Sequence, residues 1–270
     1  MCCFLKSRLP SGTVNNILNG AHDRIKHASK LLYPKIPPPS DQALKNLRGG
    51  WFEILIVAIA WNLAAEYNKT HEKKVALIHL PDARTMQFWA LYGGKAETAL
   101  NELFSSLKNS GMSLTLSNPD LLCIRSIDSE LATNFEQSIR NLTPSEIIRI
   151  NGAYKLLEKK CNFDSIVFGI AVKSVLAPDR RYQIVYEGSL LKAIVAHLRT
   201  RFWKHDLEAL YYGLISEPIS DQDKIVFTNP SIDTIVDVRS KPRKAVDEAV
   251  ACETISKAEK TIKRWLNAVA

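Results

Sequence analysis

The chain has 270 residues, of which 46% are hydrophobic, and it carries a formal net charge of +8 at pH 7 with a sequence pI near 9.2. This length and apolar content suffice for a large core, built as one domain or at most two. The basic balance favours a polyanionic partner. Nucleic acid is the first candidate, although many basic proteins bind none.

Several classes of protein are disfavoured by the same data. The five cysteines are scattered without the spacing of a metal site, which argues against a zinc centre and suits a reducing compartment. The first residues turn polar too soon for a secretory signal, and no stretch predicts a membrane span. We therefore expect a cytoplasmic protein with no membrane partner. No internal repeat or low-complexity tract is present, which excludes solenoids.

The amino-terminal part predicts a helical arm. Residues 13–33 carry apolar side chains along one side of a surface helix and basic side chains largely elsewhere. Residues 34–40, PKIPPPS, then predict a stiff extended connector. We expect one domain spanning residues 1–270, in which residues 1–40 are an arm that ends in this proline-rich connector.

A core helix is expected next. After a helix cap at Ser40 and Asp41, residues 43–47 and a Gly-Gly pair lead to residues 51–61, which are apolar on almost every face. This pattern predicts a central helix too short to cross a membrane. Glu53 is its exception, because a carboxylate among Phe, Ile and Leu needs a cation or a proton. A structural ion pair and membership of a metal site both remain open.

The middle of the chain predicts strands on either side of a helical stretch. Residues 75–80 form the first strand, residues 88–104 are helical, and residues 113–116 form a second strand. An Asn-Pro break follows, and Asp120 then opens a buried strand at residues 121–124. An aspartate in such a turn commonly bonds only its own backbone. Its position at the start of a buried strand also makes it a candidate ligand.

Two helices are expected between residues 129 and 159, with the second starting at Thr143. Residues 165–172 then form a β-branched and aromatic run that predicts a strand buried on both faces. Lys173 ends this strand. Its ammonium either extends to water along the apolar stem or meets an anion such as phosphate.

A charged turn at residues 177–181 precedes a helix that we expect to begin near Ile184. Glu187 falls on the buried stripe of this helix. Either the positive helix N-terminus stabilises its carboxylate, or Glu187 is a metal ligand. A divalent-metal site that cuts phosphodiesters needs two or more carboxylates and a cation, which Asp120, Lys173 and Glu187 would supply.

The last part of the chain predicts two strands in residues 225–238, separated by a Thr-Asn-Pro-Ser turn. A basic cluster follows at residues 239–244 and either contacts phosphates or is solvated. Residues 245–266 predict an amphipathic helix that packs on the body or on a second subunit.

These residues carry a family resemblance. A Pro-Asp pair at Asp120, followed by a strand that ends in Lys173, resembles the core of PD-(D/E)xK nucleases, in which an acidic residue stands two before the lysine. Ala171 occupies that place here. Glu187, on the next helix, instead resembles the permuted site of the type II restriction endonucleases that recognise sequences with a CCGG centre. The resemblance implies that Asp120 and Glu187 bind the metal, that Lys173 acts on the attacking water and the developing charge, and that Glu53 completes the catalytic set.

The same family follows its lysine with an Arg-x-Asp-Arg element that contacts the central base pairs in the major groove. The corresponding places hold Ala177, Asp179 and Arg180, so the first arginine is missing. An arginine fork bonds O6 and N7 of guanine and an aspartate accepts from cytosine N4. The resemblance therefore implies that Asp179 and Arg180 contact bases, with Arg181 a candidate for the missing contact. Asn46 stands where the family has a minor-groove glutamine.

The expected fold class is α/β, with a central mixed β-sheet flanked by helices. The resemblance implies cleavage of double-stranded DNA with Mg²⁺ as cofactor, at a palindrome with a CCGG core. It also implies a homodimer on the DNA and a cognate methyltransferase in the host. Two alternatives stay open: a structure-specific junction or repair nuclease of the same superfamily, and a non-catalytic DNA-binding protein.

Overall fold

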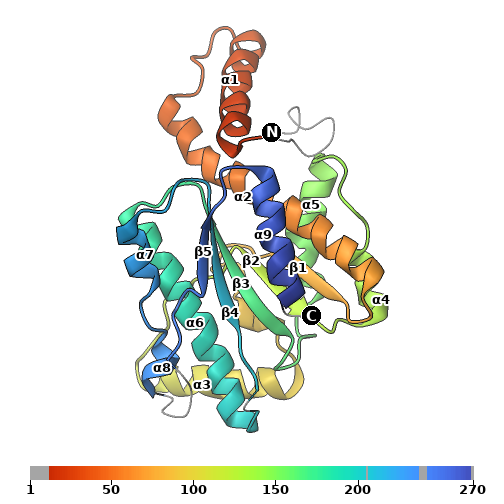
Figure 1. Ribbon diagram of the computed structural model, residues 1–270, viewed down its shortest axis with the longest axis vertical. Helices are drawn as coiled ribbons and strands as arrows, with labels where there is room; N and C mark the ends of the chain where they lie inside the picture. The colour runs from red at the N-terminus through yellow and green to blue at the C-terminus, as the bar shows by residue number, and fades with distance from the viewer. Residues whose placement is uncertain (1–11, 205, 237–241, 269–270) are drawn as a thin grey trace.

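A mixed β-sheet lies at the centre of the molecule (Figure 1). The computed structural model describes residues 12–204, 206–236 and 242–268, and in these residues five strands pair in the order β1-β2-β3-β4-β5. The first three pair antiparallel, whereas β3, β4 and β5 run parallel. The strands are β1 (Val75–His79), β2 (Leu121–Arg125), β3 (Ile166–Lys173), β4 (Leu210–Ile215) and β5 (Glu248–Ala251).

Helices cover both faces of this sheet, which confirms the predicted α/β class. Consecutive residues of β4 show the two layers: Tyr211 bonds Glu187 of α6, whereas Tyr212 stacks on Trp265 of α9 with ring centroids 4.1 Å apart. In Figure 1, α9 crosses in front of the sheet. Helix α2 contacts both the sheet and α9. The helices are α1 (Val14–Leu32), α2 (Asp41–Thr70), η2 (Phe88–Leu91), α3 (Gly94–Asn109), α4 (Ser129–Ala132), η3 (Thr133–Phe135), α5 (Pro144–Gly152), η4 (Ala153–Leu156), α6 (Pro178–Phe202), α7 (Asp221–Phe227), α8 (Ile232–Val236) and α9 (Ile255–Ala268).

The core helix α2 is longer than the sequence indicated. Ser40 caps it, its Oγ accepting from the Ala43 amide at 3.2 Å, and the helix then runs through the Gly-Gly pair without a break for 30 residues. By length and composition alone α2 could cross a membrane. In the structure it packs against β1, β3 and α9, and Phe52 and Ile56 are fully buried. Burial in the protein core therefore accounts for its apolar composition.

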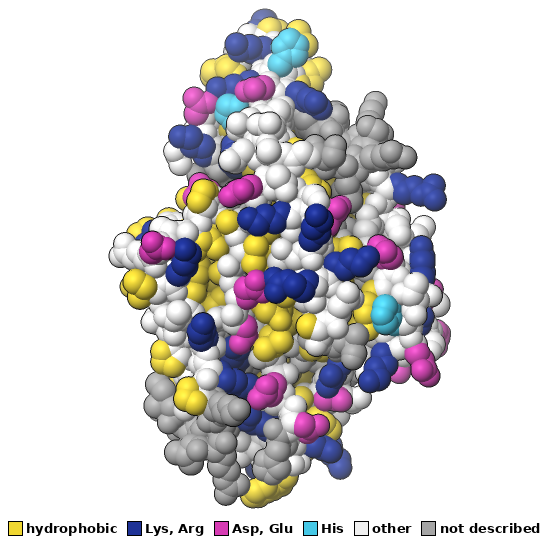
Figure 2. Space-filling model, in the orientation of Figure 1, with side chains coloured by type: hydrophobic (Ala, Val, Ile, Leu, Met, Phe, Trp, Pro, Cys, Tyr) yellow, Lys and Arg dark blue, Asp and Glu magenta, His cyan; other side chains and the backbone are white. Residues whose placement is uncertain are grey.

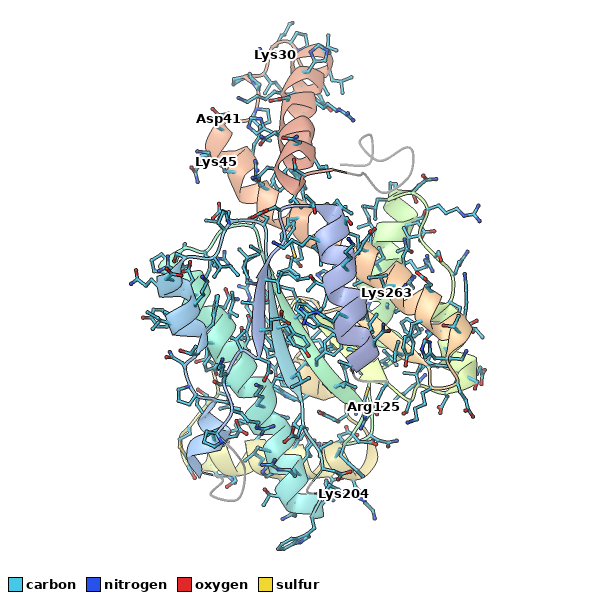
Figure 3. All side chains as sticks on the ribbon, viewed as in Figure 1. Lys30, Asp41, Lys45, Arg125, Lys204 and Lys263 are labelled. Atoms are coloured by element: carbon cyan, nitrogen blue, oxygen red, sulfur yellow. The ribbon has the colours of Figure 1, made fainter. Side chains whose placement is uncertain are left out.

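The predicted arm consists of α1 and the connector, and it rests on the start of α2. Arg48 of α2 donates to Asn19 and Asn15 of α1 at 2.6 and 2.7 Å, and Lys26 pairs with Asp41 at 2.5 Å. Figure 1 shows this part projecting from the body, Figure 2 shows basic side chains spread over it, and Figure 3 marks Lys30, Asp41 and Lys45. Residues 1–11 lie outside the described residues.

Helix α6 begins at Pro178, six residues before the expected start. A proline at the first helical position needs no amide partner and its fixed φ suits the helix, so the charged residues 177–181 form the first turn rather than a separate loop. Glu187 therefore lies in the third turn. Because the field of a helix N-terminus fades within the first turn, it cannot be what stabilises the Glu187 carboxylate.

Two predicted strand regions are wrong. Residues 113–116 are irregular and do not belong to the sheet. The strand that precedes β2 in the sheet is β1. Residues 225–238 contain the end of α7 and helix α8 in their described part. Ser220 and Asp223 start α7 with a reciprocal capping box, at 3.2 and 2.8 Å, and this local signal outweighs the β-branched composition that follows.

The carboxyl-terminal prediction is also corrected. Residues 245–266 form strand β5 and then most of α9 rather than one helix, because Asp247 accepts the Tyr211 amide at 2.6 Å and aligns β5 with β4. Of the basic cluster at 239–244, residues 239–241 lie outside the described residues, and Arg243 pairs with Asp233. The helical stretch expected at residues 88–104 divides into η2 and α3.

The close packing of α6 gives a stability prediction. A Cβ atom at Gly188 would lie 2.2 Å from the backbone oxygen of Ala245 and 2.9 Å from Tyr211 Cδ1. We expect Gly188→Ala to lower the free energy of unfolding by roughly 1–3 kcal/mol or more in urea denaturation. Gly20→Ala in α1 is the matched control: nothing lies within 4 Å of its Cβ, and it should gain about 0.5–1 kcal/mol. Equal effects of the two changes would contradict this packing.

Candidate active site

The predicted catalytic residues meet at the edge of the sheet that is formed by the ends of its strands. His79 ends β1 and pairs with Leu121 at the start of β2, and β3 ends at the same edge with Lys173. A cleft of about 750 Å³ opens there. The side chains of its lining that matter below are Lys45, Glu53, Asp82, Arg84, Ser117, Asn118, Asp120, Lys173, Ala177, Arg180 and Gln183.

Asp120 and Lys173 are in direct contact. Asp120 Oδ2 accepts from the Val172 amide at 2.6 Å and from Lys173 Nζ at 2.8 Å, while Oδ1 accepts from no donor among the described residues. Burial opposes the charge of Lys173, but the carboxylates of Asp120 and Glu187 outweigh it and raise its pKa. The ammonium does not extend to water. It stays protonated and faces the Asp120 carboxylate, and the approach of a phosphate to it stays a prediction.

Glu187 lies behind this pair and is 1% exposed. Its Oε1 accepts from Ser117 Oγ at 2.7 Å and Gln183 Nε2 at 2.8 Å, and its Oε2 accepts from Tyr211 Oη at 2.6 Å. Burial raises the pKa of Glu187; Lys173 lowers it and Asp120 adds to the rise. Ser117 and Gln183 line the cleft, so their bonds connect the Glu187 carboxylate to it.

Glu53 lines the cleft and also has a structural partner. Its Oε1 lies 2.6 Å from His79 Nε2, and His79 Nδ1 lies 2.9 Å from Asn151 Oδ1. Burial alone would lower the pKa of His79, but the bond to Glu53 raises it above its usual value. The structure shows the ion pair, and the same carboxylate also raises the pKa of Lys173. Membership of a metal site stays a prediction for Glu53.

The oxygen ligands suit a hard cation. Among the described residues no three His, Cys, Asp or Glu side chains converge closely enough to hold a metal by themselves, which excludes a closed zinc-type site there. Mg²⁺ commonly takes one or two carboxylates and keeps several waters. Asp120 and Glu187 supply the two carboxylates that such an ion needs. Among the described residues no donor bonds Asp120 Oδ1, so this oxygen is available to a cation.

The predicted DNA-contacting residues separate into two groups. Arg180 lines the cleft and donates from Nη1 to Gln183 Oε1 at 3.2 Å. Exposed Asp179 lies beside it, with Arg180 Nε and Asp179 Oδ2 3.9 Å apart. Arg181 instead pairs with Asp223 of α7, with Nε and Oδ1 2.5 Å apart, and does not line the cleft. Asn46 lies in α2, and its side chain is outside the described part of the structure.

Sequence reasoning missed the residues that hold Glu187 and Glu53. Tyr211 belongs to β4, a strand that was not predicted, and Ser117 lies in an irregular segment. Gln183 was detectable, since it stands four before Glu187 on the same helix face. His79 also gave a signal, because it ends a buried strand as Lys173 does.

This site and fold define a class. An aspartate that opens one central strand, a lysine that ends the next and a glutamate from the following helix have the arrangement expected of a PD-(D/E)xK nuclease with the permuted carboxylate.

The comparisons with known proteins narrow this class to a family. The model of the Cfr10I/Bse634I restriction endonuclease family matches residues 4–268, so the chain belongs to that family. It is 30% identical over 237 residues to the type II restriction enzyme Cfr10I of Citrobacter freundii. The aligned part covers 87% of this chain and 81% of the relative.

Solved structures agree. Bse634I restriction endonuclease superposes with a TM-score of 0.85 at 31% identity, covering 99% of this chain and 89% of the other. Bse634I with cognate DNA superposes with a TM-score of 0.82 at 30% identity, covering 99% and 90%. The chain is a type II restriction endonuclease, which disfavours the junction-nuclease and non-catalytic alternatives.

The buried carboxyl of Glu187 gives a prediction with a definite sign. Because its pKa is raised in the folded state, the stability it contributes is fully present below the unfolded pKa and is lost as the pH rises through the folded pKa. Gln at this position can accept from Ser117 and Gln183 and donate to Tyr211. We expect Glu187→Gln to be more stable than the wild type at alkaline pH and similar at acid pH, measured by urea denaturation without divalent metal.

Glu72→Gln, on an exposed residue, is the control and should leave the pH profile unchanged. Parallel profiles for the wild type and Glu187→Gln would contradict the account of a destabilising buried carboxylate.

Proposed function

We propose that this protein cleaves double-stranded DNA by Mg²⁺-dependent phosphodiester hydrolysis at a palindromic site with a CCGG core. The observation that carries the proposal is the contact of Asp120 with Lys173, with Glu187 held behind it, at a cleft in a chain of this family. The solved relative bound to cognate DNA supports double-stranded DNA as the substrate.

Lys173 acts as a cation in this proposal. Its raised pKa keeps it protonated, so it cannot take a proton from water in this state. A protonated lysine instead donates hydrogen bonds to a phosphate oxygen and stabilises the negative charge that develops in the transition state. Asp120 holds Nζ in place for this role.

Asp120 and Glu187 would hold Mg²⁺, which supplies Lewis-acid activation of the phosphate and a more acidic bound water. Ser117 and Tyr211 orient the Glu187 carboxylate and prevent its rotation. Glu53, fixed by His79, completes the set of carboxylates around Lys173. In this proposal the chain's own groups orient the reactants, and Lys173 neutralises charge.

Base recognition at the core would come from the first turn of α6. Arg180 lines the cleft, so its guanidinium can bond guanine O6 and N7, and Asp179 can accept from cytosine N4. Arg181 could contribute only by leaving Asp223. Asn46 is proposed for a minor-groove contact on the strength of the resemblance alone.

The biological setting follows from the substrate. A palindromic site matches two-fold protein symmetry, so we propose a homodimer on DNA. A cytoplasmic location and a cognate methyltransferase in the host belong to the same proposal.

Digestion of a fully sequenced phage DNA tests this function. With Mg²⁺ we expect discrete fragments whose ends lie at CCGG-containing palindromes, and without Mg²⁺ intact DNA. Lys173→Ala should abolish cleavage, because it removes the cation that faces the phosphate, whereas exposed Lys69→Ala on α2 should cleave as the wild type. Fragments ending at sites without CCGG would contradict the proposed specificity. Intact DNA from folded wild-type protein would contradict the proposed cleavage, and branched DNA would then be the next substrate.

A further inference from the structure

A second Asp-Arg pair faces the same cleft, on the loop that follows β1. Leu80 continues β1 by donating its amide to Asp120 O at 3.1 Å, and Asp82 and Arg84 follow on the lining of the cleft. Asn118 fixes this loop from the other side: its Nδ2 donates to Pro81 O at 3.0 Å and Met86 O at 2.6 Å, and its Oδ1 accepts the Phe88 amide at 2.9 Å. The loop is thus tied to the segment that carries Asp120.

The pair is joined by three hydrogen bonds and is open to solvent. Asp82 Oδ1 accepts from the Arg84 amide and from Nε, each at 2.9 Å, and Oδ2 accepts from Nη2 at 2.9 Å. These bonds to Arg84 lower the pKa of Asp82 to about 2. The Arg84 side chain is nevertheless 85% exposed. Asp82 therefore occupies the Nε/Nη2 edge of the guanidinium and leaves the Nη1/Nη2 edge available for a ligand.

Stability does not explain this arrangement. Exposed ion pairs contribute only about 0–1 kcal/mol, and holding a long side chain still costs entropy. The value of a guanidinium fixed in advance is that less freedom is lost when it binds. The free edge presents two parallel N–H groups, which match either two phosphate oxygens or the O6 and N7 atoms of guanine.

The charge of the pair decides between these two ligands. Asp82 neutralises Arg84 and would repel a phosphate group, whereas the acceptor edge of guanine is uncharged and tolerates a neighbouring carboxylate. Asp82 also keeps lone pairs that can accept from cytosine N4. Lys45, on the same cleft, pairs with no carboxylate of the described residues and suits phosphate better. Ala177, which lines the same cleft at the start of α6, has no side-chain group that could bond a base.

We propose that Arg84, held by Asp82, is a specificity-determining residue that bonds O6 and N7 of a guanine in the major groove of the bound DNA. This inference rests on the proposed function, because it requires a sequence-specific DNA complex. It adds a base contact from the β1 loop to those proposed for α6.

Competition binding without divalent metal tests the proposal, using duplexes in which each base pair of the site and its flanks is changed in turn. Wild-type protein should discriminate at every base pair of its site, and Arg84→Ala should lose about 5–150-fold of discrimination at one G·C pair and its symmetry mate alone. Asp82→Ala should lose part of it. Replacing that guanine by 7-deazaguanine, which lacks N7, should weaken the wild type and leave Arg84→Ala unaffected. Arg140→Ala, an exposed arginine away from the cleft, is the control.

Three results would overturn the inference. A uniform loss of affinity over all duplexes with a shallower salt dependence would assign Arg84 to a phosphate. Unchanged discrimination would leave it a solvated pair, and a wild type without preference for any base pair would exclude base contacts altogether. By contrast, specific binding to a site without CCGG, with the expected loss in Arg84→Ala, would overturn the proposed core sequence and keep Arg84 as a base contact.

Discussion

The interaction between Asp120 and Lys173 is the constraint on which the site depends. It joins the start of β2 to the end of β3, and the Val172 amide bonds the same carboxylate oxygen. Strand β3 pairs antiparallel with β2 and parallel with β4. The last residues of β1 and β4 therefore lie at the same edge as Lys173, and His79 is the last residue of β1. One ion pair thus defines where the cleft is and which side chains can act in it.

Charge balance around this pair explains the remaining architecture. Asp120, Glu187 and Glu53 act on a single buried ammonium, which leaves an excess of carboxyl groups at the site. The protein offsets it with neutral donors from Ser117, Gln183 and Tyr211, and with His79 on Glu53. Such an arrangement costs stability and favours a cation, the usual compromise between stability and function at a metal-dependent site.

The sequence predicted the parts of this site that depend on local signals. Asp120 after an Asn-Pro break and Lys173 after an apolar run give recognisable strand ends, and both are where they were expected. It could not show β4 and β5, because their short runs are ordered by tertiary contacts such as that of Asp247 with the Tyr211 amide. The partners of Glu187 were missed for the same reason, since Tyr211 and Ser117 reach it from distant segments.

The most direct test of this account is a paired measurement on Asp120→Asn, which keeps an acceptor oxygen for Val172 and Lys173 but removes the charge. DNA affinity is measured at equilibrium without metal, and the single-turnover cleavage rate with saturating Mg²⁺. The account predicts unchanged or tighter binding, since a negative charge near phosphate is lost, and a cleavage rate lower by at least about 10³-fold, roughly 4 kcal/mol in the barrier. Cleavage near the wild-type rate, or binding and cleavage that fall by the same factor, would contradict it.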